Sequence, residues 1–134
     1  MKTGQSYSEV FSYSQDDVIK FSELSGDKNP IHLDEEYASQ TIFKKPVIHG
    51  ILGISIFSKI MGMTFPGEGT IILKQDISFK RPLFAGDNYE ALLTVIETSP
   101  ERGHILIETK VCDTQTKKIN MIGQVLVMNK SKFA

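Results

Sequence analysis

Residues 51–61, near the middle of the chain, are apolar on nearly every side when they are drawn as a helix. The stretch reads Ile-Leu-Gly-Ile-Ser-Ile-Phe-Ser-Lys-Ile-Met. A helix that is apolar all round is buried in the core of a protein. The run therefore predicts a central helix that begins at His49-Gly50, ends near Met61, and is terminated by Gly62 and Pro66-Gly67. It is too short to span a bilayer.

After residue 68 the apolar pattern changes from a helical period to strict alternation, which is typical of strands. Each of four segments places its apolar residues on one face: Ile71, Leu73, Ile77 and Phe79; Tyr89, Ala91, Leu93 and Val95; Ile105, Ile107, Thr109 and Val111; and Ile119, Met121, Val125 and Val127. Short turns at 82–87, 99–103 and 113–118 join them, so the pattern predicts an antiparallel sheet. One apolar helix and such a sheet make an α+β domain, with the helix on the concave side of the sheet.

The segment before the central helix predicts a short strand at 7–13 and then two helices. Ser14 and Asp17 have the spacing of a capping box, and Gly26 is placed to end the first helix. Asp34 is expected to cap the second helix, because Asp is strongly preferred at that position.

Length and composition predict one domain spanning residues 1–134. The net charge of −1 gives no general attraction to nucleic acid or to an anionic membrane. Cys112 is the only cysteine, which excludes an intramolecular disulfide, and the chain starts without an apolar signal segment. We therefore expect a cytoplasmic protein.

Asp27 and His32 stand five residues apart, on either side of the Asn29-Pro30 break. Asn-Pro favours a turn, so the two side chains are expected to leave one bend together. A carboxylate and an imidazole are common partners in general acid–base chemistry. Taken alone, the hexapeptide is more typical of a surface turn with a capping Asp and an exposed His, because such turns are common.

His49 and Gly50 stand where the buried helix begins, and the first N–H groups of a helix have no partner within it. Gly50 has no side chain to cover them, so this terminus is suited to polarise a carbonyl oxygen. The alternative is a core helix whose Gly allows close packing. His49 is expected mainly to order the helix start.

These segments together resemble the MaoC-like hydratase family, and specifically its (R)-specific enoyl-CoA hydratases. The resemblance covers about residues 11–127. The matching positions are Asp27-x-Asn29-Pro30-x-His32-x-Asp34, Pro46-x-x-His49-Gly50, Phe57-Ser58 and the stretch from Ile77 to Asp87.

The resemblance implies a hot-dog fold, in which the sheet wraps the central helix, and a homodimer joined at the sheet edges. It implies reversible syn hydration of a trans-2-enoyl-CoA to an (R)-3-hydroxyacyl-CoA, without a metal or other cofactor. Asp27 and His32 would be catalytic, and the Gly50 N–H would bind the thioester oxygen. Ser58, Asn29 and His49 match positions near the substrate, where Ser58 would orient Asp27 or His32. Residues that suit an apolar tunnel wall, or equally a plain core, are Ile51, Ile54, Phe57, Leu73 and Phe79. Candidate contacts to the coenzyme A phosphates, if they are not simply solvated, are Lys44, Lys45, Lys80 and Arg81.

Three other functions remain open. A (3R)-hydroxyacyl-ACP dehydratase would use the same residues on a substrate carried by acyl-carrier protein. A hot-dog acyl-CoA thioesterase usually has an Asp or Glu on or near its central helix. Residues 51–63 contain neither, which favours hydration over hydrolysis. A binding module without catalysis would have little use for the Asp27 and His32 pair, because buried polar groups are costly. The acyl chain length and the pathway, such as fatty acid metabolism or polyester storage, are also open.

Overall fold

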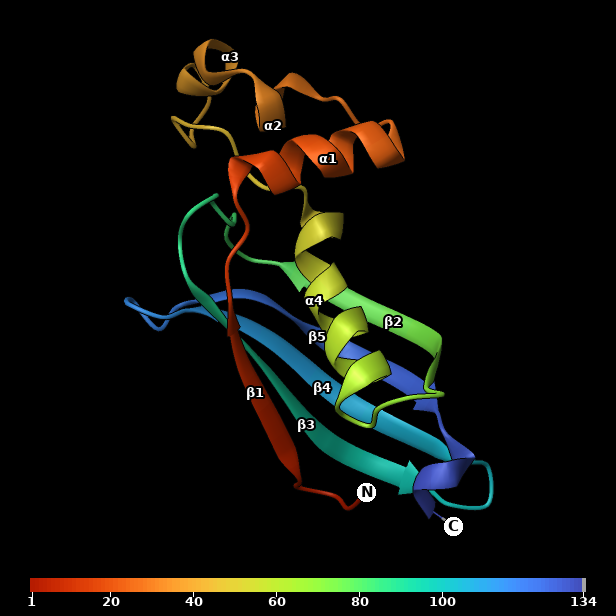
Figure 1. The fold of residues 1–134 in the computed structure, drawn as a ribbon. Coiled ribbons are helices and arrows are strands. Elements are labelled where there is room, and N and C mark those ends of the chain that lie inside the picture. The colour runs from red at the N-terminus through yellow and green to blue at the C-terminus, as the bar shows by residue number, and fades with distance from the viewer. Residues whose placement is uncertain (134) are drawn as a thin grey trace.

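The computed structural model describes residues 1–133, and its core is an antiparallel sheet with one long helix against one face (Figure 1). The strands are β1 (Ser6–Phe11), β2 (Ile71–Phe79), β3 (Tyr89–Ser99), β4 (His104–Asp113) and β5 (Ile119–Met128). The helices are α1 (Gln15–Ser25), α2 (Pro30–Leu33), α3 (Glu35–Ser39) and α4 (Gly50–Met63), with a 3₁₀ turn at Lys130–Phe133. The α+β prediction is confirmed. None of the helices within residues 1–133 is long and apolar enough to cross a membrane.

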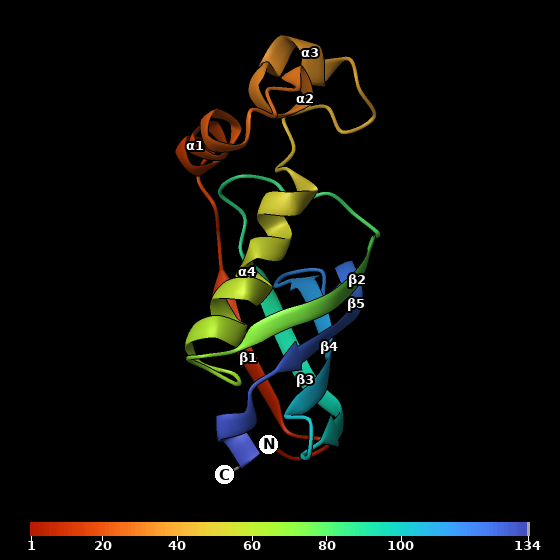
Figure 2. The same cartoon turned by 90° about the vertical axis from the view of Figure 1, so that its right-hand side faces the viewer.

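The sheet has the strand order β1-β3-β4-β5-β2, and every neighbouring pair is antiparallel. The alternation expected for β3 and β4 is confirmed, because the residues predicted to face inward are buried. In β5 it is confirmed for Met121, Val125 and Val127. It is wrong for Ile119, which pairs with Cys112 at a register shift and does not share the face of Met121, the partner of Val111. The buried apolar residues form one cluster with those of α4, which lies on one side of the sheet (Figure 2). The helix and the three central strands thus bury one shared apolar core.

The predicted face of β2 is partly wrong. A bulge between Ile72 and Lys74 adds one residue to this strand, so the alternation changes phase there. Phe79 is paired with the buried Met121 and faces α4, whereas at the other end Ile72 pairs with the buried Val127. Ile71 therefore does not share a face with Phe79. Every residue of β2 except Ile77 is exposed, because the strand forms an open edge of the sheet.

The central helix is less buried than its sequence predicts. It runs through Gly62 to Met63, and one face of it is solvent-exposed. That face carries Ile51, Ser55, Ser58, Lys59 and Met63. The opposite face holds the residues that enter the core, including Phe57 and Ile60.

Helices α1, α2 and α3 gather at the end of the molecule where α4 begins, away from both chain termini (Figure 1). The capping box of Ser14 and Asp17 starts α1, and Gly26, with a φ of 82°, ends it. Asp34 accepts a hydrogen bond from the Tyr37 N–H and caps α3. All three local predictions are confirmed, and together they bring residues 27–32 over the first turn of α4.

Candidate active site

Asp27 is held at the end of α1 by hydrogen bonds that involve its main chain and its carboxylate. Its N–H donates to Ser25 Oγ at 3.1 Å, and its Oδ1 accepts from the Asn29 N–H at 3.2 Å. The side chain itself is exposed. The carboxylate is therefore anchored by one oxygen and has the other free.

The turn predicted for residues 27–32 is only partly correct, because residues 30–33 form the one-turn helix α2. Asn29 caps this helix by accepting from the Ile31 N–H, and Pro30 takes the first helical position, where a missing N–H costs nothing. The short helix turns His32 inward, and only 9% of this residue is exposed.

The hydrogen bond of His32 Nδ1 fixes the tautomer of the ring. Nδ1 lies 2.7 Å from the carbonyl oxygen of Val47. A carbonyl oxygen only accepts, so Nδ1 carries the hydrogen and donates it. In the neutral ring Nε2 then has a free lone pair, and His32 presents a base rather than a donor.

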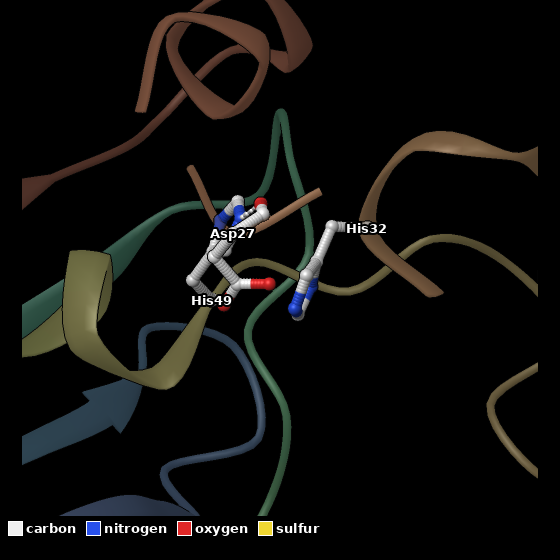
Figure 3. A group of neighbouring side chains, drawn as sticks. All are labelled: Asp27, His32 and His49. Atoms are coloured by element: carbon white, nitrogen blue, oxygen red, sulfur yellow. Dashed lines mark hydrogen bonds between the residues drawn. The ribbon is translucent and has the colours of Figure 1, made fainter. Parts of the chain in front are cut away.

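Asp27, His32 and His49 form one cluster, shown in Figure 3. Each contributes one ligand-type atom, and these atoms lie within 4.8 Å of one another. A carboxylate oxygen of Asp27 points toward the ring of His32 (Figure 3). The structure thus brings together the two residues that the sequence predicted to act as a pair.

The histidine rings of this cluster are stacked, with centroids 3.8 Å apart and planes inclined by 27°. A nitrogen lone pair lies in the plane of its ring, so two nearly parallel rings cannot both direct lone pairs at one ion about 2.1 Å away. The cluster is therefore poorly arranged to hold a metal ion.

A cavity of about 380 Å³ opens beside His32 and the first residue of α4. Asn29, His32 and Gly50 line it, together with apolar side chains that include Ile31, Phe43, Phe79, Leu83 and Met121. The exposed N–H groups of a helix start and the partial positive charge there favour an oxygen that gains negative charge. The cavity therefore combines a base, a helix N-terminus and apolar walls.

The other expected contacts are only partly found at this cavity. Lys80 and Arg81 line it, whereas Lys44 and Lys45 do not, and Lys45 lies 4.5 Å from the centre of the Phe84 ring. Of the expected tunnel walls only Phe79 borders the cavity. His49 does not line it either: its ring is 2% exposed and lies behind His32, so the expected substrate contact is not supported.

Ser58 lies far from the cluster within this chain. It follows Gly50 by eight residues, which is roughly 12 Å along a helix, and it is on the exposed face of α4. The expectation that Ser58 orients Asp27 or His32 is therefore wrong for a single copy of the chain.

A second cavity, of about 320 Å³, lies on the face of the sheet that points away from α4. Side chains of β2, β3, β4 and β5 line it, including Asp76, Glu97 and His104. None of the described residues that line it stands at a helix terminus, and acidic and basic side chains are mixed there. We assign no chemistry to it.

Two residues that hold the site were not found from the sequence. Val47 acts through its main-chain carbonyl, which has no sequence signature. Ser22 Oγ lies 3.0 Å from His49 Nε2, and Ser22 is buried four residues after Val18 on the apolar side of α1. A Ser on an apolar stripe needs a polar partner, and that spacing was the available signal.

Comparison with known proteins agrees with this geometry. Residues 2–117 match the model of the MaoC like domain family. An (R)-specific enoyl-CoA hydratase of Rhodospirillum rubrum is 37% identical over 128 residues, covering 96% of this chain and 88% of that protein. The solved (R)-hydratase from A. caviae involved in PHA biosynthesis superimposes with a TM-score of 0.91 at 33% identity, covering 96% of both chains. The R-hydratase PhaJ1 from Pseudomonas aeruginosa gives a TM-score of 0.88 at 34% identity, over 96% of this chain and 81% of that one. The fold is thus the hot-dog fold of these hydratases, and the chain belongs to the MaoC-like domain family.

Proposed function

We propose that this protein is an (R)-specific enoyl-CoA hydratase, a hydro-lyase that reversibly adds water to trans-2-enoyl-CoA and forms (R)-3-hydroxyacyl-CoA. The observation that carries the proposal is the His32 Nε2 lone pair, left free by the Nδ1 bond to Val47 and placed beside Asp27 at a cavity. The names of the related hydratases support the same reaction.

The catalytic pair of the proposed reaction is Asp27 and His32. A water between them donates one hydrogen bond to the Asp27 carboxylate and the other to His32 Nε2, since both are acceptors. As the water oxygen bonds to C3 of the enoyl group, His32 takes one of its protons, and the C2–C3 π electrons move toward the thioester. The same proton then passes to C2, so atoms and charge balance and addition is syn. Addition of water involves no net oxidation or reduction, so the proposed reaction uses no redox cofactor, and we propose no other cofactor.

The thioester oxygen gains negative charge as the enolate forms, and Gly50 is positioned to stabilise it. Gly50 is the first residue of α4 and lines the cavity, and its N–H is one of those without an intrahelical partner. A donor aimed at such an oxygen typically contributes about 10²–10³-fold in rate. Asn29 also lines the cavity, but its side-chain oxygen is used in the cap of α2.

The substrate carrier is coenzyme A in this proposal, and the Lys80 and Arg81 side chains at the cavity would meet its phosphates. Acyl-carrier protein is acidic, so the same cations would suit a (3R)-hydroxyacyl-ACP dehydratase. Turnover of crotonyl-CoA and of crotonyl-ACP, measured side by side, separates the two carriers. Thioester hydrolysis is less well supported, because α4 has no acidic residue.

We also propose a homodimer in which two copies pair their β2 edges. The support is the open edge of β2 and its exposed apolar side chains, of which Ile71 is 53% and Leu73 is 45% exposed. A long apolar edge strand of this kind is a template for pairing with another strand.

The test is the loss of enoyl-thioester ultraviolet absorbance when crotonyl-CoA is added to wild type, His32→Ala and His104→Ala. His104 lies in the second cavity, so its substitution controls for loss of an imidazole elsewhere. We expect rapid loss with wild type and His104→Ala and very slow loss with His32→Ala. If His32→Ala is as active as wild type, His32 has no part in the mechanism. If wild type hydrates neither short nor long enoyl thioesters of coenzyme A or of acyl-carrier protein, the proposed function is wrong.

A further inference from the structure

His49 immediately precedes α4, yet its side chain makes no capping hydrogen bond to that helix. Its Nε2 instead lies 3.0 Å from Ser22 Oγ and 3.2 Å from the main-chain oxygen of Asp27. One imidazole nitrogen therefore connects α1, the segment after α1 and the start of α4.

The ring of His49 also contacts two other rings, those of Phe21 and His32. Phe21 packs edge-on against it, with centroids 4.8 Å apart and an angle of 65°, and His32 stacks on it at 3.8 Å. With 2% of the residue exposed, the ring has no room to change its orientation. The ring of His32 is thus held by this stack together with its Nδ1–H bond to the Val47 carbonyl.

The hydrogen-bond partners make His49 a neutral donor. The Asp27 carbonyl only accepts, so Nε2 carries the hydrogen. Nδ1 is buried and has no partner among residues 1–133, so a proton there would be a buried donor without an acceptor. Burial, the largest effect, lowers the pKa of His49. A neutral ring adds no repulsion when His32 takes a proton during hydration.

We propose that His49, held by Ser22, is a positioning residue for both catalytic groups, through its Nε2–H to the Asp27 main chain and its ring face against His32. The inference rests on the proposed hydratase function and adds two residues to that site. A shift of about 1 Å in the position of a catalytic group lowers the rate by on the order of 10²-fold. The contacts that hold Asp27 and His32 in place are therefore expected to affect kcat.

Three variants each remove a different contact of His49. His49→Phe keeps a ring for the stack and removes the donor; His49→Gln keeps a donor and removes the ring; Ser22→Ala removes only the hydroxyl. His104→Gln is the matched control, because it removes a histidine outside the cluster. We expect kcat to fall by about 10-fold to 10²-fold in both His49 variants, with KM changing by less than about twofold, because the cavity lining is unchanged. Ser22→Ala should fall less, and the control should match wild type.

A second readout distinguishes positioning from loss of stability. The acidic limb of the kcat/KM–pH profile should move in both His49 variants, because His49 lies against His32 together with Asp27, while Lys80 and Arg81 line the same cavity and stay unchanged. Imidazole nitrogen NMR signals of His32 should move likewise, and this measurement needs no activity. If wild type fails to hydrate any enoyl thioester, the proposed function fails, and the NMR signals alone still decide the positioning role.

Unchanged kcat, pH profile and His32 signals in folded His49→Phe and His49→Gln would overturn the inference. If neither His49 variant folds, Ser22→Ala decides in their place: a lower kcat and a shifted His32 signal support positioning, and wild-type values of both overturn it.

Discussion

At the scale of single residues, the proposed reaction depends on two groups that accept hydrogen bonds, the Asp27 carboxylate and His32 Nε2. Asp27→Asn keeps an oxygen for the Asn29 N–H but removes the charge. We expect kcat for crotonyl-CoA to fall by roughly 10²-fold or more, because an uncharged amide holds the water less strongly and does not stabilise His32 when His32 takes the proton. Asp16→Asn, at an exposed ion pair with Lys20, should retain wild-type kcat. Near-wild-type turnover by Asp27→Asn would contradict the assigned role.

The buried His49 predicts a pH dependence of stability. Its pKa is lowered in the folded protein from the ordinary value of 6.5, so the unfolded chain binds a proton that the folded chain does not. The stabilisation by neutral His49 is complete above about pH 6.5 and is lost as the pH falls through the lower, folded pKa. The Tm difference between wild type and His49→Gln should therefore be largest above pH 7 and shrink in acid. A difference that stays constant with pH would contradict the prediction.

At the scale of the helices and strands, the start of α4 depends on the absence of a side chain at Gly50. A Cβ there would lie 2.7 Å from the ring of Phe79, which also lines the cavity. Gly50→Ala should displace that ring and raise KM for crotonyl-CoA. Gly62→Ala is the control: nothing lies within 4 Å of its Cβ, so it should stabilise α4 by up to about 1 kcal/mol at unchanged KM. Equal KM values for both variants would mean that Phe79 does not limit substrate entry.

The elements that were predicted correctly are those set by local signals. The capping residues of α1 and α3 act within a few positions of their own helices, and short turns force antiparallel pairing of β3, β4 and β5. The errors concern long-range packing. The bulge in β2 and the exposed face of α4 depend on what lies opposite them, which alternation and composition do not report.

The same distinction applies to the site. Asp27, His32 and Gly50 were found because their residue types carry the chemistry and the resemblance aligns them. The Val47 carbonyl, which fixes the His32 tautomer, and Ser22, which holds His49, were missed because they act through a tertiary contact. Ser58 was misplaced because sequence spacing gives its distance along α4 but not the neighbours of its exposed face.

At the scale of the whole molecule, the open β2 edge predicts the assembly state. Light scattering after size exclusion should give a dimer for wild type. Ile71→Lys and Leu73→Lys place charges on that edge and should give monomers with an unchanged circular dichroism spectrum. Leu24→Lys, at a residue of α1 that is 87% exposed, should remain dimeric. A monomeric wild type, or dimers of both edge variants, would contradict pairing through β2.

The most direct test of the account is mass spectrometry of the product formed from crotonyl-CoA in water labelled with heavy oxygen. We expect an intact coenzyme A thioester that has gained one labelled water for wild type and not for Asp27→Asn or His32→Ala. Chiral chromatography of the wild-type product should then give the (R) configuration at C3. Free coenzyme A together with labelled crotonate would contradict the account, because that pair of products is formed by hydrolysis of the thioester rather than by addition to the double bond.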